Sequence, residues 1–276
     1  MMLEIKDLKV GFQNEVGPAT DVVHGISFSL GKGETLGIVG ESGSGKSVLS
    51  LATIGLLPKT AKATGEILFN GEDILTMSER ELCKLRGSRI GMIFQEPMTA
   101  LNPAMKVGSQ IAEALRLHSN ISRADANAEA LRLLEMVKIP DAKRKMHSYP
   151  HEMSGGQRQR VGIAIALSLK PDLLIADEPT TALDVTVQAE ILDILDDLVT
   201  ELGIALILIS HDLGVIARIA DRTLVMYRGN EMEQGETERV LRQPSHDYTR
   251  KLLSALPRRA RAGLDVMAPT TLGDSV

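Results

Sequence analysis

The feature that most restricts the fold of this chain is a glycine-rich segment, Gly40–Ser47 (GESGSGKS), which matches the pattern G-x-x-x-x-G-K-[ST]. It follows a short apolar run, Thr35–Val39, and opens a segment with a helical pattern, Ser47–Leu57. In that setting backbone N–H groups converge on an anion, and the helix N-terminus adds partial positive charge. Lys46 can reach the outer phosphates of a nucleotide, and the Ser47 hydroxyl can bind Mg²⁺. The competing interpretation, a glycine-rich turn with a solvated lysine, accounts for neither the spacing nor the flanking elements. The candidate phosphate ligands are Gly40, Glu41, Ser42, Gly43, Ser44, Gly45, Lys46 and Ser47.

The rest of the chain alternates strand-like runs with helical segments. The continuous apolar runs Leu173–Ala176 and Ile204–Ile209 are typical of strands buried on both faces. Between them, Thr186–Leu202 has a helical pattern that Gly203 ends. The chain from about 106 to 146 is mostly helical in pattern. The sequence therefore predicts an α/β nucleotide-binding fold with a helical insertion. Further predicted strands are Leu3–Phe12, Val22–Leu30, Glu66–Asn70, Ile90–Phe94, Thr223–Met226 and Asn230–Gln234, and a helix is predicted over Ser78–Leu85.

The composition excludes several classes of protein. Hydrophobic residues make up 43% and charged residues 24%, as in a globular protein with a substantial core. The net charge of −5 gives no basic footprint, so we expect no nucleic-acid partner. One cysteine, Cys83, rules out a disulfide framework and a cysteine-based metal cluster within one chain. The apolar runs are far shorter than the roughly 18–20 residues that cross a bilayer, and the first ten residues do not resemble a secretory signal. We therefore expect a cytoplasmic chain that reaches a membrane only through another protein.

Two carboxylates follow the apolar run Leu173–Ala176. A buried parallel strand would deliver Asp177 to the carboxyl edge of the sheet, where such folds bind their ligands. Asp177 is suited to hold Mg²⁺, and Glu178 is suited to act as the general base that activates an attacking water. Acidic residues also end many strands for structural reasons alone, and it is the phosphate loop in the same chain that favours the chemical interpretation.

A second glycine motif, Ser154–Gln157 (SGGQ), precedes an apolar helical segment, Arg160–Leu169. Ser154 is a natural N-cap, and Gly155 and Gly156 allow close backbone approach. A plain capped helix explains this segment equally well by itself. As an anion site it would be the second in the chain, and one triphosphate does not need two separate cradles.

These motifs, in this order, resemble the ATP-binding cassette (ABC) ATPases, the motor subunits of ABC transporters, over about residues 1–255. The resemblance implies a P-loop NTPase of the α/β class, with an antiparallel β subdomain, a RecA-like core and an inserted helical subdomain at about 96–170. It implies an ATPase domain at 1–235 and a short C-terminal extension at 236–276. It also implies ATP as ligand, Mg²⁺ as cofactor and hydrolysis coupled to transport.

The resemblance assigns further residues. It identifies Gly40–Ser47 as the Walker A loop, Asp177 as the Walker B aspartate and Glu178 as the catalytic carboxylate. Gln95 matches the Q-loop glutamine, which touches Mg²⁺ and water and senses the membrane partner, and His211 matches the switch histidine that contacts the γ-phosphate. In the trans role implied for this family, Ser154, Gly155, Gly156, Gln157 and Asp184 of one protomer complete the ATP site of another. Phe12 lies where the family has an aromatic residue that stacks on adenine.

Each of these residues also has a structural interpretation. Gln95 fits a surface loop, and His211 fits a cap of the next helix. Asp184 fits the N-cap of the helix over Thr186–Leu202, and it can serve both purposes. Phe12 fits the core, where an aromatic near a strand end is common.

Two segments narrow the resemblance to the importers of oligopeptides, dipeptides and nickel. They are Phe94–Pro103 (FQEPMTALNP) and Gln243–Thr249 (QPSHDYT) with the following 251–257. This group implies two transmembrane permease subunits, a second ATPase subunit and an extracytoplasmic solute-binding protein. It places the chain peripherally on the cytoplasmic face of the inner membrane. Peptides are the predicted solute, and nickel or another small solute is the alternative.

One departure concerns a cofactor. Many peptide-importer ATPases carry a C-terminal cysteine cluster for an iron–sulfur centre, and this chain has only Cys83, so we expect no such cluster. His147 and His151 are four residues apart, but the Pro150 between them argues against a regular helix that would pair them on a metal.

Three other classes compete with a transport ATPase. A P-loop GTPase would need an N-K-x-D motif, which the sequence lacks. A soluble ABC ATPase of DNA repair or translation would show tandem cassettes, a long coiled-coil insertion or a basic patch. A non-catalytic regulatory cassette would have lost Glu178 or His211, and the sequence retains both.

Overall fold

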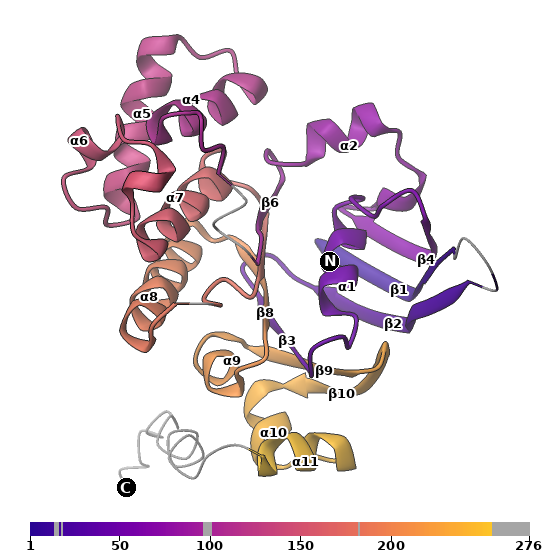
Figure 1. Ribbon diagram of the computed structural model, residues 1–276. Coiled ribbons are helices and arrows are strands. Elements are labelled where there is room, and N and C mark those ends of the chain that lie inside the picture. Colours follow the sequence, from indigo (N-terminus) through magenta and orange to yellow (C-terminus); the bar gives the residue numbers. More distant parts are fainter. Residues whose placement is uncertain (14–16, 18, 96–100, 182, 256–276) are drawn as a thin grey trace, which may run out of the picture.

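The computed structural model describes residues 1–13, 17, 19–95, 101–181 and 183–255, and it is built on two β-sheets (Figure 1). The first sheet is antiparallel, with strand order β2-β1-β4-β5. The buried residues of β1 are Leu3, Ile5, Leu8 and Val10, so the period of two holds on each side of an irregularity between Ile5 and Leu8. The bounds are Leu3–Phe12 for β1, Thr20–Leu30 for β2, Ala61–Phe69 for β4 and Glu72–Asp73 for β5.

The second sheet has six strands in the order β10-β9-β3-β8-β7-β6. The five strands from β9 to β6 are parallel, and β10 pairs antiparallel with β9 at one edge. Strands β3, β7 and β8 are buried along their whole lengths, which confirms the prediction from the apolar runs in β7 and β8. The bounds are Thr35–Val39 for β3, Ile90–Ile93 for β6, Leu173–Asp177 for β7, Ala205–Ser210 for β8, Arg222–Tyr227 for β9 and Asn230–Glu236 for β10.

The six-stranded sheet separates two hydrophobic cores. Along β8, Leu206 and Leu208 belong to the core formed with the helices, whereas Ile207 and Ile209 belong to the core formed with the antiparallel sheet. Because successive side chains of a strand alternate between faces, a continuous apolar run fills both cores at once. Figure 1 shows the corresponding layers, with helices α4–α8 on one side and the antiparallel sheet with α1 on the other.

The helices of the described residues fall into groups along the chain (Figure 1). Helix α1 begins directly after the phosphate loop, and α2 lies between β5 and β6. Helices α4–α8 lie together on one side of the six-stranded sheet, where α4 and α5 pack on α7 and α7 contacts β6. Helix α9 follows β8, and α10 and α11 follow β10. Short 3₁₀ turns occur at Ile74–Thr76 and Pro150–Glu152. The bounds are Lys46–Thr53 for α1, Glu79–Leu85 for α2, Val107–His118 for α4, Arg123–Met136 for α5, Ala142–Lys145 for α6, Gly155–Leu167 for α7, Val185–Leu202 for α8, Leu213–Ile219 for α9, Thr237–Arg242 for α10 and Asp247–Ser254 for α11.

The order of predicted strands and helices is confirmed, and several boundaries were wrong. Helix α1 ends at Thr53 and not at residue 57, because Gly55 takes a positive φ of 62° and Pro58 follows. Strand β4 begins at Ala61, five residues before the prediction, because it pairs with the last residues of β1 as far as Phe12. Helix α7 begins five residues before its predicted apolar part, directly after the cap Ser154.

Candidate nucleotide site

The predicted site residues meet at one edge of the six-stranded sheet because neighbouring strands end there together. In the parallel register, Val39 of β3 pairs with Ser210 of β8, and Asp177 of β7 pairs with Ile209. The phosphate loop, Glu178 and His211 each follow one of these ends, and Gln95 follows the end of β6. The carboxyl edge of such a sheet is where α/β folds bind ligands.

The phosphate loop surrounds the ammonium group of Lys46 with its own oxygen atoms. Lys46 Nζ donates hydrogen bonds to Gly40 O at 2.8 Å, Glu41 O at 2.9 Å and Ser44 Oγ at 3.3 Å. The lysine is only 5% exposed, and this burial lowers its pKa, while the carboxylates of Glu178 and Asp177 act to raise it. The loop therefore holds a buried cation at its centre.

The loop opens into a cavity of about 180 Å³. Its wall includes Gln95 and Glu178, which lie far from the loop in sequence. Val22 of β2 closes another side, so the antiparallel sheet also contributes to the wall. The remaining lining residues are Ser42, Gly43, Ser44, Gly45, Lys46, Ser47 and Val48.

The carboxylate of Glu178 contacts side chains from several parts of the chain. Its Oε2 atom accepts hydrogen bonds from Gln95 Nε2 at 3.1 Å and from Thr181 Oγ1 at 2.9 Å. His211 Nδ1 lies 3.5 Å from the same oxygen. The carboxylate is only 14% exposed. One carboxylate is thus held by three side chains from three different segments.

The backbone of Glu178 is also unusual. Its φ is +46°, in the left-handed region that non-glycine residues rarely occupy. The N–H of Glu178 donates to Ile209 O at 2.9 Å, which ties the turn to strand β8. Conformations of this kind cost free energy and persist only where surrounding contacts impose them.

Asp177 has the properties of a metal ligand. It is 4% exposed, and among the described residues its Oδ1 atom has no hydrogen-bond partner. Burial raises its pKa, while the side chains of Ser47 and Ser50 act to lower it. A buried carboxylate oxygen without a partner beside a serine hydroxyl suits a cation that prefers oxygen ligands, such as Mg²⁺. The residues present therefore fit the predicted metal.

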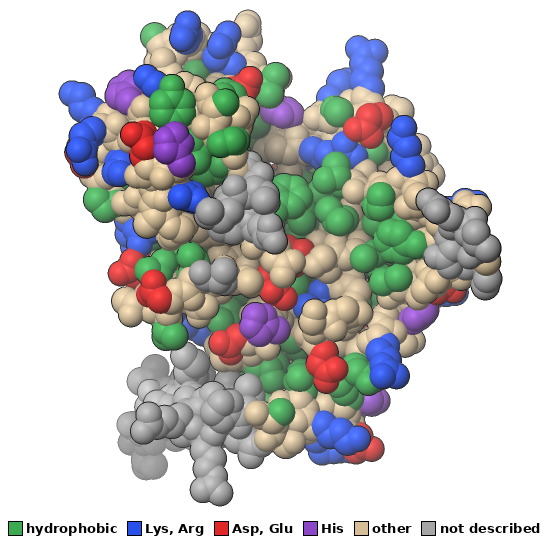
Figure 2. All heavy atoms as spheres, viewed as in Figure 1, with side chains coloured by type: hydrophobic (Ala, Val, Ile, Leu, Met, Phe, Trp, Pro, Cys, Tyr) green, Lys and Arg blue, Asp and Glu red, His purple; other side chains and the backbone are tan. Residues whose placement is uncertain are grey.

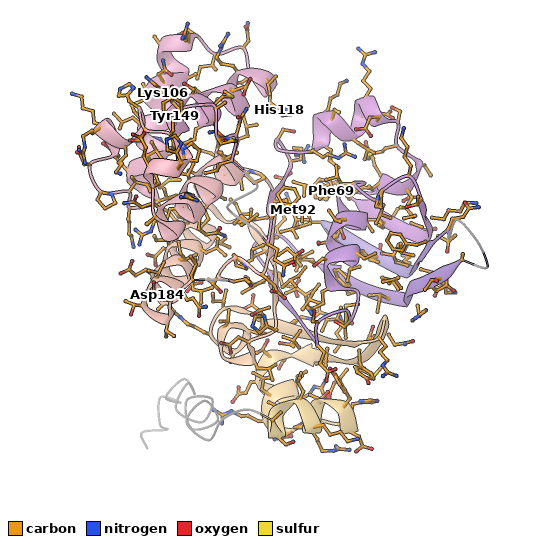
Figure 3. The ribbon with its side chains drawn as sticks, in the orientation of Figure 1. Phe69, Met92, Lys106, His118, Tyr149 and Asp184 are labelled. Atoms are coloured by element: carbon orange, nitrogen blue, oxygen red, sulfur yellow. The ribbon has the colours of Figure 1, made fainter. Side chains whose placement is uncertain are left out.

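The second glycine motif forms a capping box at the start of α7. Ser154 Oγ accepts from Gln157 N at 3.3 Å, and Gln157 Oε1 accepts from Ser154 N at 3.3 Å. Asp184 caps α8, with Oδ1 accepting from Val187 N at 3.0 Å, and Figure 3 labels it at the start of that helix. Neither Asp184 nor Ser154–Gln157 lines the cavity among the described residues. Both segments therefore carry the predicted caps, and the chain does not bring them to its own phosphate loop.

Two other predicted residues have clear surroundings. Phe12 is partly buried at the end of β1 and packs against the core of the antiparallel sheet. The structure therefore agrees with the interpretation that Phe12 belongs to the core. Its stacking on adenine stays a prediction. The cap of α9 is Asp212, which accepts from Gly214 N at 2.8 Å, so the alternative role of His211 as that cap was wrong.

The pair His147 and His151 lies near the start of α7. The ring of His151 stacks on Tyr149, with centroids 5.7 Å apart, and Pro150 begins a 3₁₀ turn. The region around Gln95 is only partly described, because residues 96–100 of the predicted Phe94–Pro103 segment lie outside the described residues.

Sequence reasoning missed Thr181, which completes the hydrogen bonds to Glu178. A signal was present, since a hydroxyl three residues after a carboxylate can reach back across a turn, and Thr181 N donates to Glu178 O at 3.2 Å. It also missed Val22 and the β9–β10 turn, which reach the phosphate loop only through the tertiary fold.

An apolar groove lies beside the end of β6. It has a volume of about 110 Å³ and includes Phe94, a large hydrophobic side chain that is 43% exposed. Figure 2 shows hydrophobic side chains gathered beside the antiparallel-sheet layer on this face, with acidic and basic ones interspersed elsewhere. Among the described residues, no helix combines the length and the hydrophobicity needed to cross a membrane.

The family match and the similar proteins agree with one another. The family described as ABC transporter matches residues 23–181. The chain is 52% identical to the oligopeptide transport ATP-binding protein OppD of Salmonella typhimurium over 267 residues, which are 97% of this chain and 79% of that protein. It is 49% identical to the dipeptide transport ATP-binding protein DppD of Bacillus subtilis over 259 residues, which are 93% of this chain and 77% of that protein.

Two solved structures are similar in fold. The dimeric ATP-binding cassette MJ0796, in a post-hydrolysis state with ADP and Pi, has a TM-score of 0.76 at 27% identity, over 86% of this chain and 99% of that chain. The cbiO1 protein of Clostridium perfringens, part of an ABC transporter complex, has a TM-score of 0.75 at 29% identity, over 95% of this chain and 98% of that chain.

Proposed function

This chain belongs to the ABC transporter family, and from that premise we propose that it is the ATP-binding and ATP-hydrolysing subunit of an importer that takes up peptides. ATP binding and hydrolysis follow from the family. The predicted α/β cassette fold is confirmed by the similar cassettes. Relatives named for oligopeptide and dipeptide transport support peptides as the solute.

The observation that carries the chemistry is the placement of Glu178 at the wall of the phosphate cavity, held by Gln95, Thr181 and His211. In the proposed reaction Glu178 accepts a proton from the attacking water. The water oxygen bonds to the γ-phosphorus, the bond to the β–γ bridging oxygen breaks, and ADP and phosphate form. Gln95 and Thr181 fix the carboxylate, and His211 reaches the transferred phosphoryl group.

Lys46 and the loop amides bind the phosphates. Lys46 Nζ would exchange the oxygens of Gly40, Glu41 and Ser44 for those of the β- and γ-phosphates. The N–H groups of Gly43–Ser47 and the start of α1 add the partial positive charge of a helix N-terminus. Phe12 is the proposed contact to adenine.

Ser47, Asp177 and Gln95 are the proposed ligands of Mg²⁺. When bound, the ion would neutralise charge on the outer phosphates. The unpartnered Oδ1 of buried Asp177 is the feature of this chain that fits it.

A pair of cassettes is the proposed working unit. Ser154, Gly155, Gly156 and Gln157, together with Asp184, lie outside the chain's own cavity, and we propose that they complete the ATP site of a second ATPase subunit. ATP between the two would favour the closed pair, and hydrolysis would remove the phosphate charge that holds it. A ligand with different affinities for two states is what drives such a cycle.

The proposed setting is the cytoplasmic face of the inner membrane, with two permease subunits and, indirectly, a solute-binding protein. The apolar groove at Phe94, next to Gln95, is the proposed contact with a permease. We also propose an ATPase domain at 1–235, a helical subdomain at about 96–170 within it and an extension at 236–276.

The test of the hydrolytic role is Glu178→Gln. This variant keeps the shape of the side chain and loses its basicity, so we expect ATP binding to persist and phosphate release to fall by about 10²–10⁴-fold. Glu72→Gln, an exposed carboxylate on β5, is the matched control and should hydrolyse ATP at the parent rate. Hydrolysis by Glu178→Gln at the parent rate would remove the proposed base.

The solute class is tested in cells that carry Glu178→Gln in place of the parent chain. We expect uptake of a labelled tripeptide to be lost and uptake of the corresponding free amino acid to be unchanged. Normal tripeptide uptake together with lost nickel uptake would assign the chain to the alternative solute.

A further inference from the structure

The C-terminal helix α11 is fixed to strand β10 by one buried carboxylate. Glu233 of β10 is 5% exposed and accepts hydrogen bonds from Ser245 N at 2.9 Å, Ser245 Oγ at 2.7 Å and His246 N at 3.1 Å. His246 then caps α11, since its Nδ1 accepts from Tyr248 N at 3.1 Å. The first turn of α11 therefore has a defined place on the sheet.

That place brings Tyr248 against the end of β9. The rings of Tyr248 and Tyr227 are in contact, with centroids 4.4 Å apart and planes inclined by 32°. Tyr227 is the last residue of β9, and the turn Arg228–Gly229 leads from it to β10. An aromatic pair at this distance stabilises the contact beyond the area it buries.

The same turn supports the phosphate loop. Gly229 N donates to Ser44 O at 3.0 Å, and Gly229 O accepts from His24 N at 2.8 Å. A Cβ on Gly40 would overlap the carbonyl oxygen of Met226, so the loop and the end of β9 are in direct backbone contact. Figure 1 shows the β9–β10 hairpin between α11 and the loop that follows β3. An uninterrupted set of contacts thus runs from α11 to the loop.

The hydroxyl of Tyr248 lies within interaction range of Glu41, the second residue of the phosphate loop. It is buried and, within the described part of the chain, has no hydrogen-bond partner. Burial raises the pKa of Tyr248, and Glu41 acts on it through both its backbone and its carboxylate. A buried hydroxyl without a partner is unfavourable, so a position of Glu41 that completes this bond is stabilised.

We propose that Tyr248 is a positioning residue for the phosphate loop, and that through it the C-terminal extension sets the affinity for the nucleotide. The ring of Tyr248 packs on Tyr227 and so stabilises the β9–β10 turn that contacts Ser44. When Lys46 leaves the carbonyl of Glu41 to bind a phosphate, the hydroxyl of Tyr248 forms a hydrogen bond with Glu41. This inference rests on the proposed function, because it concerns the nucleotide that the loop binds. It adds a part of the chain outside the cassette motifs to the site.

The experiment measures ATP binding by titration calorimetry with Mg²⁺, using the full chain in the Glu178→Gln background. For Tyr248→Ala we expect the Kd of ATP to rise about tenfold, the upper end of what loss of one aromatic pair produces. Tyr248→Phe keeps the ring and should restore most of the affinity, leaving a rise of about two- to threefold. In the parent background KM should rise with kcat little changed.

The matched control is Leu252→Ala, which truncates a partly buried side chain one turn further along α11. It should lower the melting temperature as Tyr248→Ala does and leave the Kd of ATP unchanged. If Leu252→Ala and Tyr248→Ala raise the Kd of ATP equally, the effect comes from a general destabilisation of α11 and the proposal is wrong. If neither Tyr248 variant changes Kd or KM, it is also wrong. A parent chain that neither binds nor hydrolyses ATP would instead contradict the proposed function.

A spectroscopic measurement follows from the composition. The chain has three tyrosines and no tryptophan, so Tyr149→Phe leaves Tyr227 and Tyr248 as the only emitters. We expect their emission to change on titration with MgADP, with the same midpoint as a calorimetric titration of the same chain with MgADP. Unchanged emission at saturating MgADP would show that the tyrosine pair does not respond to the loop, against the proposal.

Discussion

Glu178 is held by neighbours from three segments, and at the scale of single residues their contributions can be separated. Thr181→Val removes the hydroxyl that donates to Glu178 Oε2 while keeping the side-chain volume. A hydrogen bond to a charged group is worth about 1.5–3 kcal/mol, so we expect kcat to fall roughly 10–100-fold. KM should stay near the parent value, because Thr181 does not line the cavity.

Two variants make the Thr181 prediction specific. Thr181→Ser retains a donor and should recover most of the rate, and Thr200→Val, at an exposed position on α8, should have no effect. Steady-state phosphate release gives both constants. A rise in KM with an unchanged kcat would show that Thr181 acts on nucleotide binding and not on the base Glu178.

Lys46→Ala tests the phosphate loop itself. The ammonium group is the centre of the loop's hydrogen bonds, and it is the proposed partner of two phosphates. We expect ATP affinity to fall at least tenfold, since at least one charge-assisted hydrogen bond is lost. Equilibrium binding of ATP measures this, and tight binding by the variant would contradict the assigned role.

Most of these positions could be predicted from sequence because each lies at or just after the end of a parallel strand. Asp177 and Glu178 follow the apolar run of β7, His211 follows the last residue of β8, and the parallel register brings such ends to one edge. Tyr248 could not be connected to the site in this way. Its contact depends on where α11 docks, which the hydrogen bonds of Glu233 decide through the tertiary fold.

At the scale of elements, Glu233 links β10 to α11, and its ionisation stabilises the fold. Burial acts to raise its pKa, but hydrogen bonds from Ser245 and His246 outweigh burial and lower the pKa to about 2. Arg239 lies 3.5 Å away and also favours the charged form. Because the folded pKa is below the ordinary value of 4.5, the stabilisation is fully present above about pH 4.5 and is lost as pH falls towards 2.

Glu233→Gln should therefore destabilise the chain most at neutral pH. The shift corresponds to about 3 kcal/mol at most, and the difference from the parent should shrink as pH falls below 4.5. Urea unfolding at pH 7, 4.5 and 3.5 measures it. A difference that is constant over this range would show that the charge of Glu233 is not the source of the stabilisation.

Element boundaries were less predictable than element order. Helix α1 ends at Thr53, shortly before Gly55 and Pro58. The residues from Ile54 to Leu57 are mostly apolar, so the sequence pattern predicted that the helix continues. Strand β4 was recognised only over its apolar half. Its first residues alternate between partly buried alanines, Ala61 and Ala63, and exposed residues, and they are strand because β1 offers them backbone partners.

At the scale of the whole molecule, two cores share the six-stranded sheet, and the sequence indicates this through its continuous apolar strands. What one chain cannot supply is the second half of the proposed nucleotide site. Ser154 is exposed at the start of α7, away from the lining of the cavity. The association of two chains is therefore the property that tests the complete arrangement.

We expect Glu178→Gln with ATP to migrate as a dimer in size-exclusion chromatography, and Ser154→Ala in that background to remain monomeric. Ser122→Ala is a close control, because Ser122 also caps a helix, α5, by accepting from Asp125 N at 3.1 Å. Each change removes a cap worth about 1 kcal/mol, so equal losses of stability are expected. If Glu178→Gln alone, with Ser154→Ala and with Ser122→Ala all form the same fraction of dimer with ATP, Ser154 is not part of the interface.

The hydrogen bonds of Lys46 within its own loop have one more consequence. A small anion such as inorganic phosphate meets a cation that is already satisfied, and it must displace several oxygens in return for one group. ATP brings several charged groups at once, together with the proposed contact of its base, so more interactions offset this exchange. We therefore expect the loop to bind ATP far more tightly than inorganic phosphate, and competition of free phosphate against ATP binding measures the difference.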